Sequence, residues 1–277
     1  PMRAEVVEFA NVEALEAAPK DSLAGKIAYV SNRMRRTRDA EGYGEAVAAR
    51  GAASLAAERG AVAYLLRSIG TSHDRFPHTG IMRYKDGVAR IPAAALSNPD
   101  ADFLSNMLRR GQPVVVELDI DAGMGPQYES ANVIAELRGR ERPEEIVLIG
   151  AHLDSWDLGT GAIDDAAGIA ITARAAALIA ALPRRPRRSI RVVAFANEEQ
   201  GLIGGNAYGT AHAEEIARHV IGAESDLGAG RIYAFATSPL PAPAQPVAQQ
   251  IAQALAPLGI EYRPGEGHVG PDLIPMM

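Results

Sequence analysis

Hydrophobic and polar positions alternate in short blocks over the first 120 residues. Short apolar blocks bounded by polar or turn residues are typical of buried strands. They predict strands at 27–31, 61–66, 91–96 and 114–120. An alanine-rich stretch over 43–59, closed by Gly60, predicts a helix, and Asn98-Pro99-Asp100 opens another. DAGMGP at 121–126 is rich in turn residues, so we expect a smaller α+β domain over 1–126.

In the remaining chain, predicted strands alternate with longer helices. Strands are predicted at 132–137, 146–151, 190–196, 220–224 and 232–237, and helices at 165–182, 205–218 and 246–258, followed by an extended tail. We expect the first two of these strands to pair through the charged connection RGRERPEE. Alternation of this kind predicts an α/β domain over 127–277, with a mostly parallel sheet flanked by helices.

Composition excludes several classes of protein. The net charge of −6 argues against nucleic acid as a partner, and no apolar stretch is long enough to span a membrane. The absence of Cys excludes disulfides, thiolate nucleophiles and Cys-ligated zinc. The basic clusters RMRRTR at 33–38 and RRPRR at 184–188 are predicted to be solvated surface. The first residues do not have the pattern of a signal peptide.

Acidic residues and one histidine follow the ends of successive predicted strands. They are His152, Asp154, Asp164, Asp165, Glu198, Glu199 and Asp226. Singly, each has a plain structural explanation, such as a helix N-cap or an exposed loop acid. Together they gather negative charge at one edge of a parallel sheet, where ligands bind and where a cation would offset the repulsion. Mixed imidazole and carboxylate ligands favour zinc or a similar divalent ion.

The spacing of these residues also suggests separate roles. Successive residues leaving a strand point in roughly opposite directions. One carboxylate of the Glu198–Glu199 pair is therefore expected to bind metal, and its neighbour to act as general base on water. Asp154 is expected to orient the ring of His152.

A dinucleotide-binding loop is the rival interpretation of the same segment. The order strand, G-x-G-x-x at 159–163 and helix resembles that fingerprint. However, Asp164 occupies the third glycine position, and its charge would repel a pyrophosphate. The sequence therefore favours the metal site.

Three motifs, HLDSWDLGTGAIDDAAG, FANEEQGLIGG and GAESDLG, resemble the successive metal-site motifs of the M28 zinc peptidases. The segments PHTGIMRYKDGVARIPAAALS and GEGHVGPDLIP are similar to the carboxypeptidase Q branch of that family. The resemblance covers nearly the whole chain. It implies a zinc-exopeptidase-like α/β domain and a protease-associated domain in the first half.

The resemblance also implies a site and an activity. The implied metal ligands are His152, Asp164 as the bridge between two zinc ions, Glu199 and Asp226. Glu198 would be the general base and Asp154 the residue that orients His152. The implied activity is that of a metallo-exopeptidase that hydrolyses small peptides or dipeptides through zinc-activated water. Gly267, His268 and Asp272 would lie on the substrate side, and a homodimer that is secreted or periplasmic is expected.

One family feature does not occur before Met277. The family's fifth ligand is a His in a His-His-x-x-x-x-Asp-Thr-like stretch, so the chain resembles a member truncated at both ends. Such a site would hold two zinc ions, one or none. The alternative function is therefore a non-catalytic binding protein on the peptidase scaffold.

Overall fold

The computed structural model describes residues 1–39, 41–78, 80–123 and 125–277. This part of the chain divides into two compact units. Unit 1 comprises Pro1–Gln127 with Trp156–Leu158, and unit 2 comprises Tyr128–Ser155 with Gly159–Met277. Within the described ranges, we find no helix with the length and apolar character that a membrane span requires.

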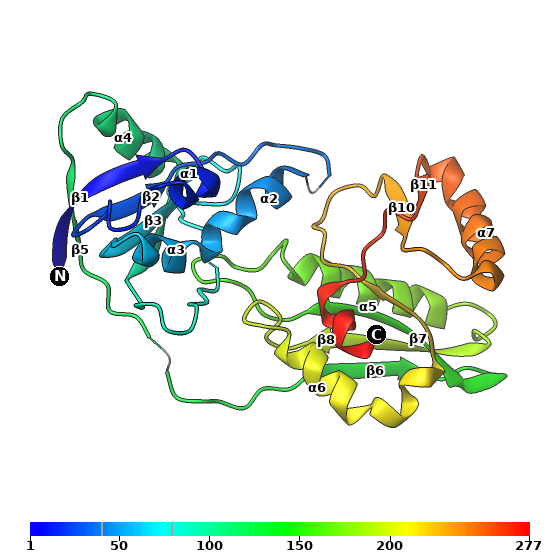
Figure 1. Ribbon diagram of the computed structural model, residues 1–277. Coiled ribbons are helices and arrows are strands. Elements are labelled where there is room, and N and C mark those ends of the chain that lie inside the picture. Colours follow the sequence, from blue (N-terminus) through cyan, green and yellow to red (C-terminus); the bar gives the residue numbers. More distant parts are fainter. Residues whose placement is uncertain (40, 79, 124) are drawn as a thin grey trace. The chain divides into compact units, whose positions relative to one another are not determined.

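Unit 1 is built on one sheet with the strand order β4-β3-β2-β1-β5 (Figure 1). The strands are β1 (Met2–Phe9), β2 (Ile27–Val30), β3 (Ala63–Arg67), β4 (Ala93–Leu96) and β5 (Val115–Leu118). Strands β1 to β4 are parallel, and β5 is antiparallel to β1. Side chains of a strand alternate between the faces of its sheet. Ile27 and Tyr29 accordingly pack in one core cluster, and Ala28 and Val30 in the other.

Helices cover both faces of this sheet. Leu15 of α1 (Val12–Glu16), Ala46 of α2 (Glu41–Ala46) and Ala53 of α3 (Ala53–Glu58) join the core cluster of Ala28. The other face is covered by α4 (Asn98–Leu108), whose N-cap residue Ser97 accepts a hydrogen bond from the backbone of Asp100.

Two predictions for this half are wrong in detail. The helix expected over 43–59 is split into α2, a 3-10 turn (Val47–Gly51) and α3, in a stretch where glycines lower the helix propensity. Strand β1 was not expected, because charged residues interrupt its apolar positions and only Val6 is fully buried.

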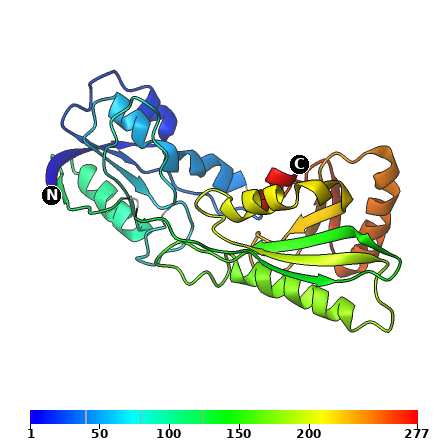
Figure 2. The ribbon, with the colours of Figure 1, turned by 90° about the horizontal axis from the view of Figure 1, so that it is seen from below.

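Unit 2 contains a sheet with the strand order β6-β8-β7-β9. The strands are β6 (Val133–Leu137), β7 (Arg142–His152), β8 (Arg188–Phe195) and β9 (His219–Glu224). Strand β7 is parallel to both β8 and β9, and β6 is antiparallel to β8. Figure 2 shows this sheet between α5 (Ala166–Ala180) and α6 (Ile203–Ala211), which lie on opposite faces. The α6 face holds a core of Leu148, Phe195, Tyr208 and Leu273.

The expected pairing of 132–137 with 146–151 is wrong. β6 hydrogen-bonds to β8, and the charged residues from Arg142 to Glu145 already belong to β7. Hydrophobic periodicity predicts where strands form, but it carries no information on which strands pair.

The end of the chain is more regular than the extended tail that was predicted. After a short 3-10 turn (Ala213–Arg218) and β9, strands β10 (Ala234–Thr237) and β11 (Glu261–Pro264) pair in parallel. Helix α7 (Gln245–Leu255) lies between them in sequence, followed by a 3-10 turn (Ala256–Leu258). A last 3-10 helix (Pro271–Met276) packs with Leu273 in the core of unit 2.

Candidate metal centre

The parallel strands β7, β8 and β9 of unit 2 end at the same edge of their sheet. His152 is the last residue of β7 and lies opposite Phe195, the last residue of β8. Gly150 of β7 pairs with Glu224, the last residue of β9. The loops that follow therefore open side by side, as expected at the carboxyl ends of parallel strands.

His152 lies at the centre of the site, and its side chain is 1% exposed. Its ring Nε2 is 3.0 Å from Oδ1 of Asp164 and 3.3 Å from Oδ1 of Asp226. Its Nδ1 lies 3.0 Å from the backbone carbonyl oxygen of Asp154. The Asp154 carboxylate is farther away, at 3.5 Å, so the carbonyl is the closer partner that fixes the ring.

The electrostatics of His152 follow from this arrangement. Burial lowers the pKa of the imidazole, but hydrogen bonds with Asp154, Asp164 and Asp226 outweigh burial and raise the pKa above its ordinary value. The surrounding carboxylates therefore favour a positive charge at Nε2. A divalent cation between the imidazole nitrogen and the carboxylate oxygens would also supply this positive charge.

The Glu198–Glu199 pair is positioned by Asp154. Oδ1 of Asp154 accepts a hydrogen bond of 2.8 Å from the backbone N–H of Glu198, and Oδ2 of Asp154 accepts one of 3.1 Å from the backbone N–H of Glu199. These bonds and the His152 bond outweigh burial, which raises the pKa of Asp154, and hold that pKa below its ordinary value. One side chain thus ties the loop after β8 to the loop after β7.

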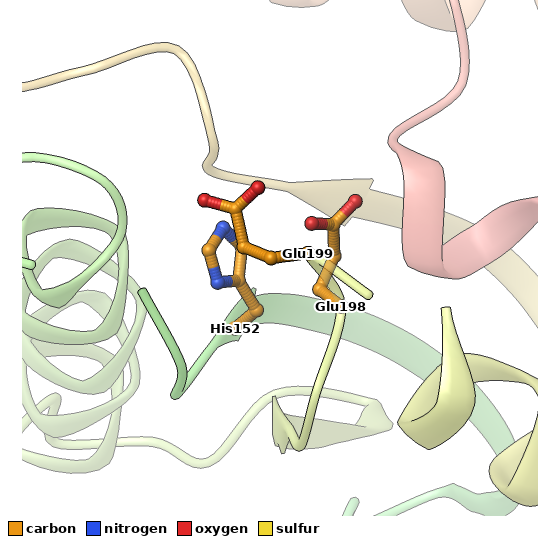
Figure 3. A group of neighbouring side chains, drawn as sticks. All are labelled: His152, Glu198 and Glu199. Carbon is orange, nitrogen blue, oxygen red and sulfur yellow. The ribbon is translucent and has the colours of Figure 1, made fainter. Parts of the chain in front are cut away.

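The two glutamates do not point in opposite directions. Figure 3 shows both carboxylates on the same side, beside the imidazole of His152. The expectation was wrong because β8 ends at Phe195, and Asn197 then adopts a left-handed backbone with φ of 57°. Strand alternation does not continue through such a turn.

Burial raises the pKa of Glu198 to about 7, and the negative charges of Glu199, Asp226 and Asp272 add to the rise. The positive charge of His152 opposes it. A carboxylate with a pKa near neutral pH suits general-base catalysis.

Two groups of side chains offer ligand atoms for a metal ion. His152, Asp164 and Asp226 form one group, and His152, Glu198 and Glu199 form the other. In each group the ligand atoms lie within 4.8 Å of one another. An imidazole nitrogen with carboxylate oxygens is a donor set that suits zinc or a similar ion, so the residues present fit such a metal.

Asp165 contacts both the end of β7 and the start of α5. Its side chain is buried, caps α5 by accepting a 3.1 Å bond from the Gly168 N–H, and accepts a 3.0 Å bond from the backbone N–H of His152. Burial raises its pKa to about 6. The peptide bond between Asp164 and Asp165 is cis. The two hydrogen bonds of the Asp165 carboxylate join the start of α5 to the end of β7.

The residues predicted for the substrate side differ in exposure and lie outside the groups of possible metal ligands. His268 is exposed, and the backbone N–H of Gly267 donates to the carbonyl of Thr237 at 3.0 Å. Asp272 is 0% exposed. None of the three belongs to either metal-type group formed by the residues that the structure describes.

One partly buried acid, Glu224, was not predicted as part of the site. Its Oε2 accepts a 3.0 Å bond from the backbone N–H of Asp272, which anchors the last 3-10 helix to the end of β9. Burial raises the pKa of Glu224 to about 8 and that of Asp272 to about 6. The signal was available, because Glu224 stands two positions before Asp226 in the motif GAESDLG.

Known proteins resemble this chain in sequence and in fold. The family model described as Peptidase family M28 matches residues 132–273. Carboxypeptidase Q of Mus musculus is 42% identical over 173 residues, which are 62% of this chain and 37% of the relative. A crystal structure of a peptidase M28 precursor from Shewanella amazonensis SB2B is 47% identical, with a TM-score of 0.94, over 98% of this chain and 62% of that one.

The chain therefore belongs to peptidase family M28. It spans less than two fifths of the length of this carboxypeptidase Q. BSAP, a zinc aminopeptidase from Bacillus subtilis, is 18% identical with a TM-score of 0.61, over 99% of this chain and 62% of that one, and shows the fold alone. The α/β fold class predicted from the sequence is confirmed.

Proposed function

We propose that this chain carries the metal centre of a zinc metallo-exopeptidase that hydrolyses small peptides, including dipeptides. The observation that carries the proposal is the environment of His152. Its Nε2 faces Asp164 at 3.0 Å and Asp226 at 3.3 Å. One ligand atom from each of His152, Glu198 and Glu199 also lies within 4.8 Å of the other two. Membership of peptidase family M28 and the likeness to carboxypeptidase Q support the same function.

In this proposal the ligands divide between two zinc ions. His152, Asp164 and Asp226 would hold one ion, and Glu199, together with the shared Asp164, would hold the other. Bound zinc would lower the pKa of a water molecule and polarise the scissile carbonyl.

Glu198 supplies the proton transfer. Its carboxylate takes a proton from the attacking water as the new C–O bond forms, and delivers it to the leaving amine as the C–N bond breaks. Asp154 holds the backbone of Glu198 and the ring of His152, so it is a positioning residue.

The other expectations from the sequence stay predictions. They are a protease-associated role for the domain at 1–126, a substrate-side loop with Gly267, His268 and Asp272, a homodimer, and a secreted or periplasmic location. The α/β domain over 127–277 would carry the chemistry.

The test compares glutamate-to-glutamine variants of the whole chain. Zinc per chain is measured by mass spectrometry after gel filtration, and hydrolysis is measured on a panel of dipeptides. Glu198→Gln is expected to keep zinc and to lose at least about 100-fold in rate. Glu199→Gln is expected to lose zinc. Glu214→Gln, an exposed glutamate on the 3-10 turn after α6, is the matched control and should change neither.

Three results would contradict parts of the proposal. A full rate in Glu198→Gln removes the general-base assignment. A folded wild-type chain that takes up no zinc removes the metal centre. Zinc binding by a wild-type chain that hydrolyses no peptide supports the alternative, a non-catalytic binding protein.

A further inference from the structure

Unit 1 contains a basic hollow that the proposed function does not use. Its volume is about 320 Å³, and its lining includes Arg33, Arg36 and Arg67 together with the loop from Gly70 to His73. Two of these arginines belong to the cluster RMRRTR, which the sequence analysis interpreted as solvated surface. The structure adds a third, buried guanidinium from the end of β3.

Arg67 is fixed in place. It is 2% exposed, its Nε donates to the carbonyl of Ser31 at 3.1 Å, and its Nη1 donates to the side-chain oxygen of Asn98 at 3.2 Å. Its Nη2 contacts Oδ1 of Asp102. A buried guanidinium held by so many bonds forms a rigid positive wall of the hollow.

The carboxylates at this wall do not balance the positive charge of its arginines. Arg33 contacts the same oxygen of Asp102 as Arg67 does, so two guanidinium groups share one carboxylate. Arg36 makes no hydrogen bond or ion pair with any residue that the structure describes. Three arginine charges therefore face one carboxylate, which leaves an excess of two positive charges.

Other nearby acids are already engaged. Asp100 is paired with Arg75 at 2.6 Å. Asp74 accepts a 3.0 Å bond from the hydroxyl of Ser72, and its side chain is not among those that line the hollow. Glu8 and Arg109 line a second hollow, which shares Arg33 and Arg67 with the first. That pair balances in charge, so the excess at the first hollow remains.

The loop adds donors without charge. Within the described ranges, the backbone N–H groups from Gly70 to His73 have no protein acceptor. These N–H groups are therefore open to an acceptor from outside the protein, and backbone N–H groups are donors that anions can use.

We propose that this hollow binds a phosphate group. A phosphate carries close to two negative charges at neutral pH and several acceptor oxygens, which matches the charge excess and the number of donors. A carboxylate would neutralise half of the excess. The proposal concerns unit 1 alone and does not depend on the proposed peptidase activity.

The test is calorimetric titration of the whole chain with sodium phosphate at constant ionic strength and pH 7.5, with sodium acetate as the comparison. We expect saturable binding of one phosphate per chain and at least about tenfold weaker binding of acetate. The double variant Arg33→Gln/Arg36→Gln should weaken phosphate binding at least about tenfold. Arg184→Gln, in the other basic cluster, is the control and should bind as the wild type does.

Because Arg36 is exposed and makes no protein contact of this kind, Arg36→Gln alone tests the site without a folding risk. It should also weaken binding. Stronger binding of glycerol phosphate than of inorganic phosphate assigns the hollow to a phosphate monoester, and the reverse order assigns it to the free ion. The proposal is overturned by an absence of saturable phosphate binding, by equal binding of acetate, or by a double variant that binds like the wild type.

Discussion

Gly168 lies in the first turn of α5, where the helix passes the loop that carries Asp226. A Cβ atom at this position would lie 2.6 Å from Oδ2 of Asp165 and closer still to the backbone carbonyl oxygen of Ser225. Ordinary contacts of a Cβ atom begin at 3.4 Å. In Gly168→Ala, these neighbours must therefore retreat by more than about 0.8 Å, the difference between the two distances.

Two opposing effects decide the magnitude. Alanine is a better helix former than glycine, which stabilises the variant by about 1 kcal/mol. Overpacking against a well-fixed neighbour costs about 3 kcal/mol at the upper end of its range, and a backbone carbonyl has little freedom to move. We expect the free energy of unfolding of unit 2 to fall by about 2 kcal/mol. Since Asp226 follows Ser225, zinc affinity under the proposed function should fall about tenfold.

The assay combines urea unfolding with hydrogen exchange of the backbone of β9, because the two units need not unfold together. The matched control is Gly44→Ala in α2, where an added Cβ has no neighbour within 4 Å. That variant should gain up to about 1 kcal/mol from helix propensity. A Gly168→Ala variant that is as stable as the wild type, with unchanged exchange in β9, would refute the reasoning.

Two further predictions follow from single carboxylates. Asp154→Ala removes the acceptor of two backbone N–H groups, so zinc affinity in a zinc titration should fall about 10- to 100-fold. The control variant Asp157→Ala, in the same loop, should leave the zinc affinity unchanged. Equal affinities in the two variants would contradict the positioning role. In unit 1, burial raises the pKa of Asp102, but Arg67 and Arg33 outweigh it and hold that pKa below its ordinary value. The ion pairs therefore stabilise the fold above the unfolded pKa of about 3.9 and lose this effect as pH falls through the lower folded pKa. In urea unfolding at pH 6, the free energy of unfolding of Asp102→Asn should be about 3 kcal/mol lower than that of the wild type. At pH 3 this difference in stability should be smaller. A difference that is the same at both pH values would contradict the stabilising role of the ionised Asp102.

Much of the site could be predicted from the sequence, because the ends of apolar blocks mark the ends of strands. His152 and Asp226 each follow an apolar block, and parallel strands end at one edge of their sheet. The structure brings these two residues within 3.3 Å. The helix-start position of Asp165 was also readable, since an acid before an apolar helical run is a common N-cap.

Contacts made through the backbone could not be predicted in the same way. Nothing in the periodicity indicates that Asn197 turns the chain after β8, so the direction of Glu198 and Glu199 was misjudged. The pairing of β6 with β8 instead of β7 was hidden for a related reason, because a strand's own pattern contains no mark of its neighbour.

Asp154 shows how such a contact changes the interpretation of a single residue. The sequence assigned its carboxylate to the ring of His152. In the structure that carboxylate lies 3.5 Å from the ring and also accepts from the backbone N–H groups of Glu198 and Glu199, while the Asp154 carbonyl is the closer partner of the ring. A residue that only oriented the ring would affect one ligand. Under the proposed function, a residue that joins the loops after β7 and β8 would affect the imidazole, the carboxylate ligand Glu199 and the general base Glu198 together. Its loss should therefore disturb metal binding and proton transfer at once, which a change in the ring alone would not do.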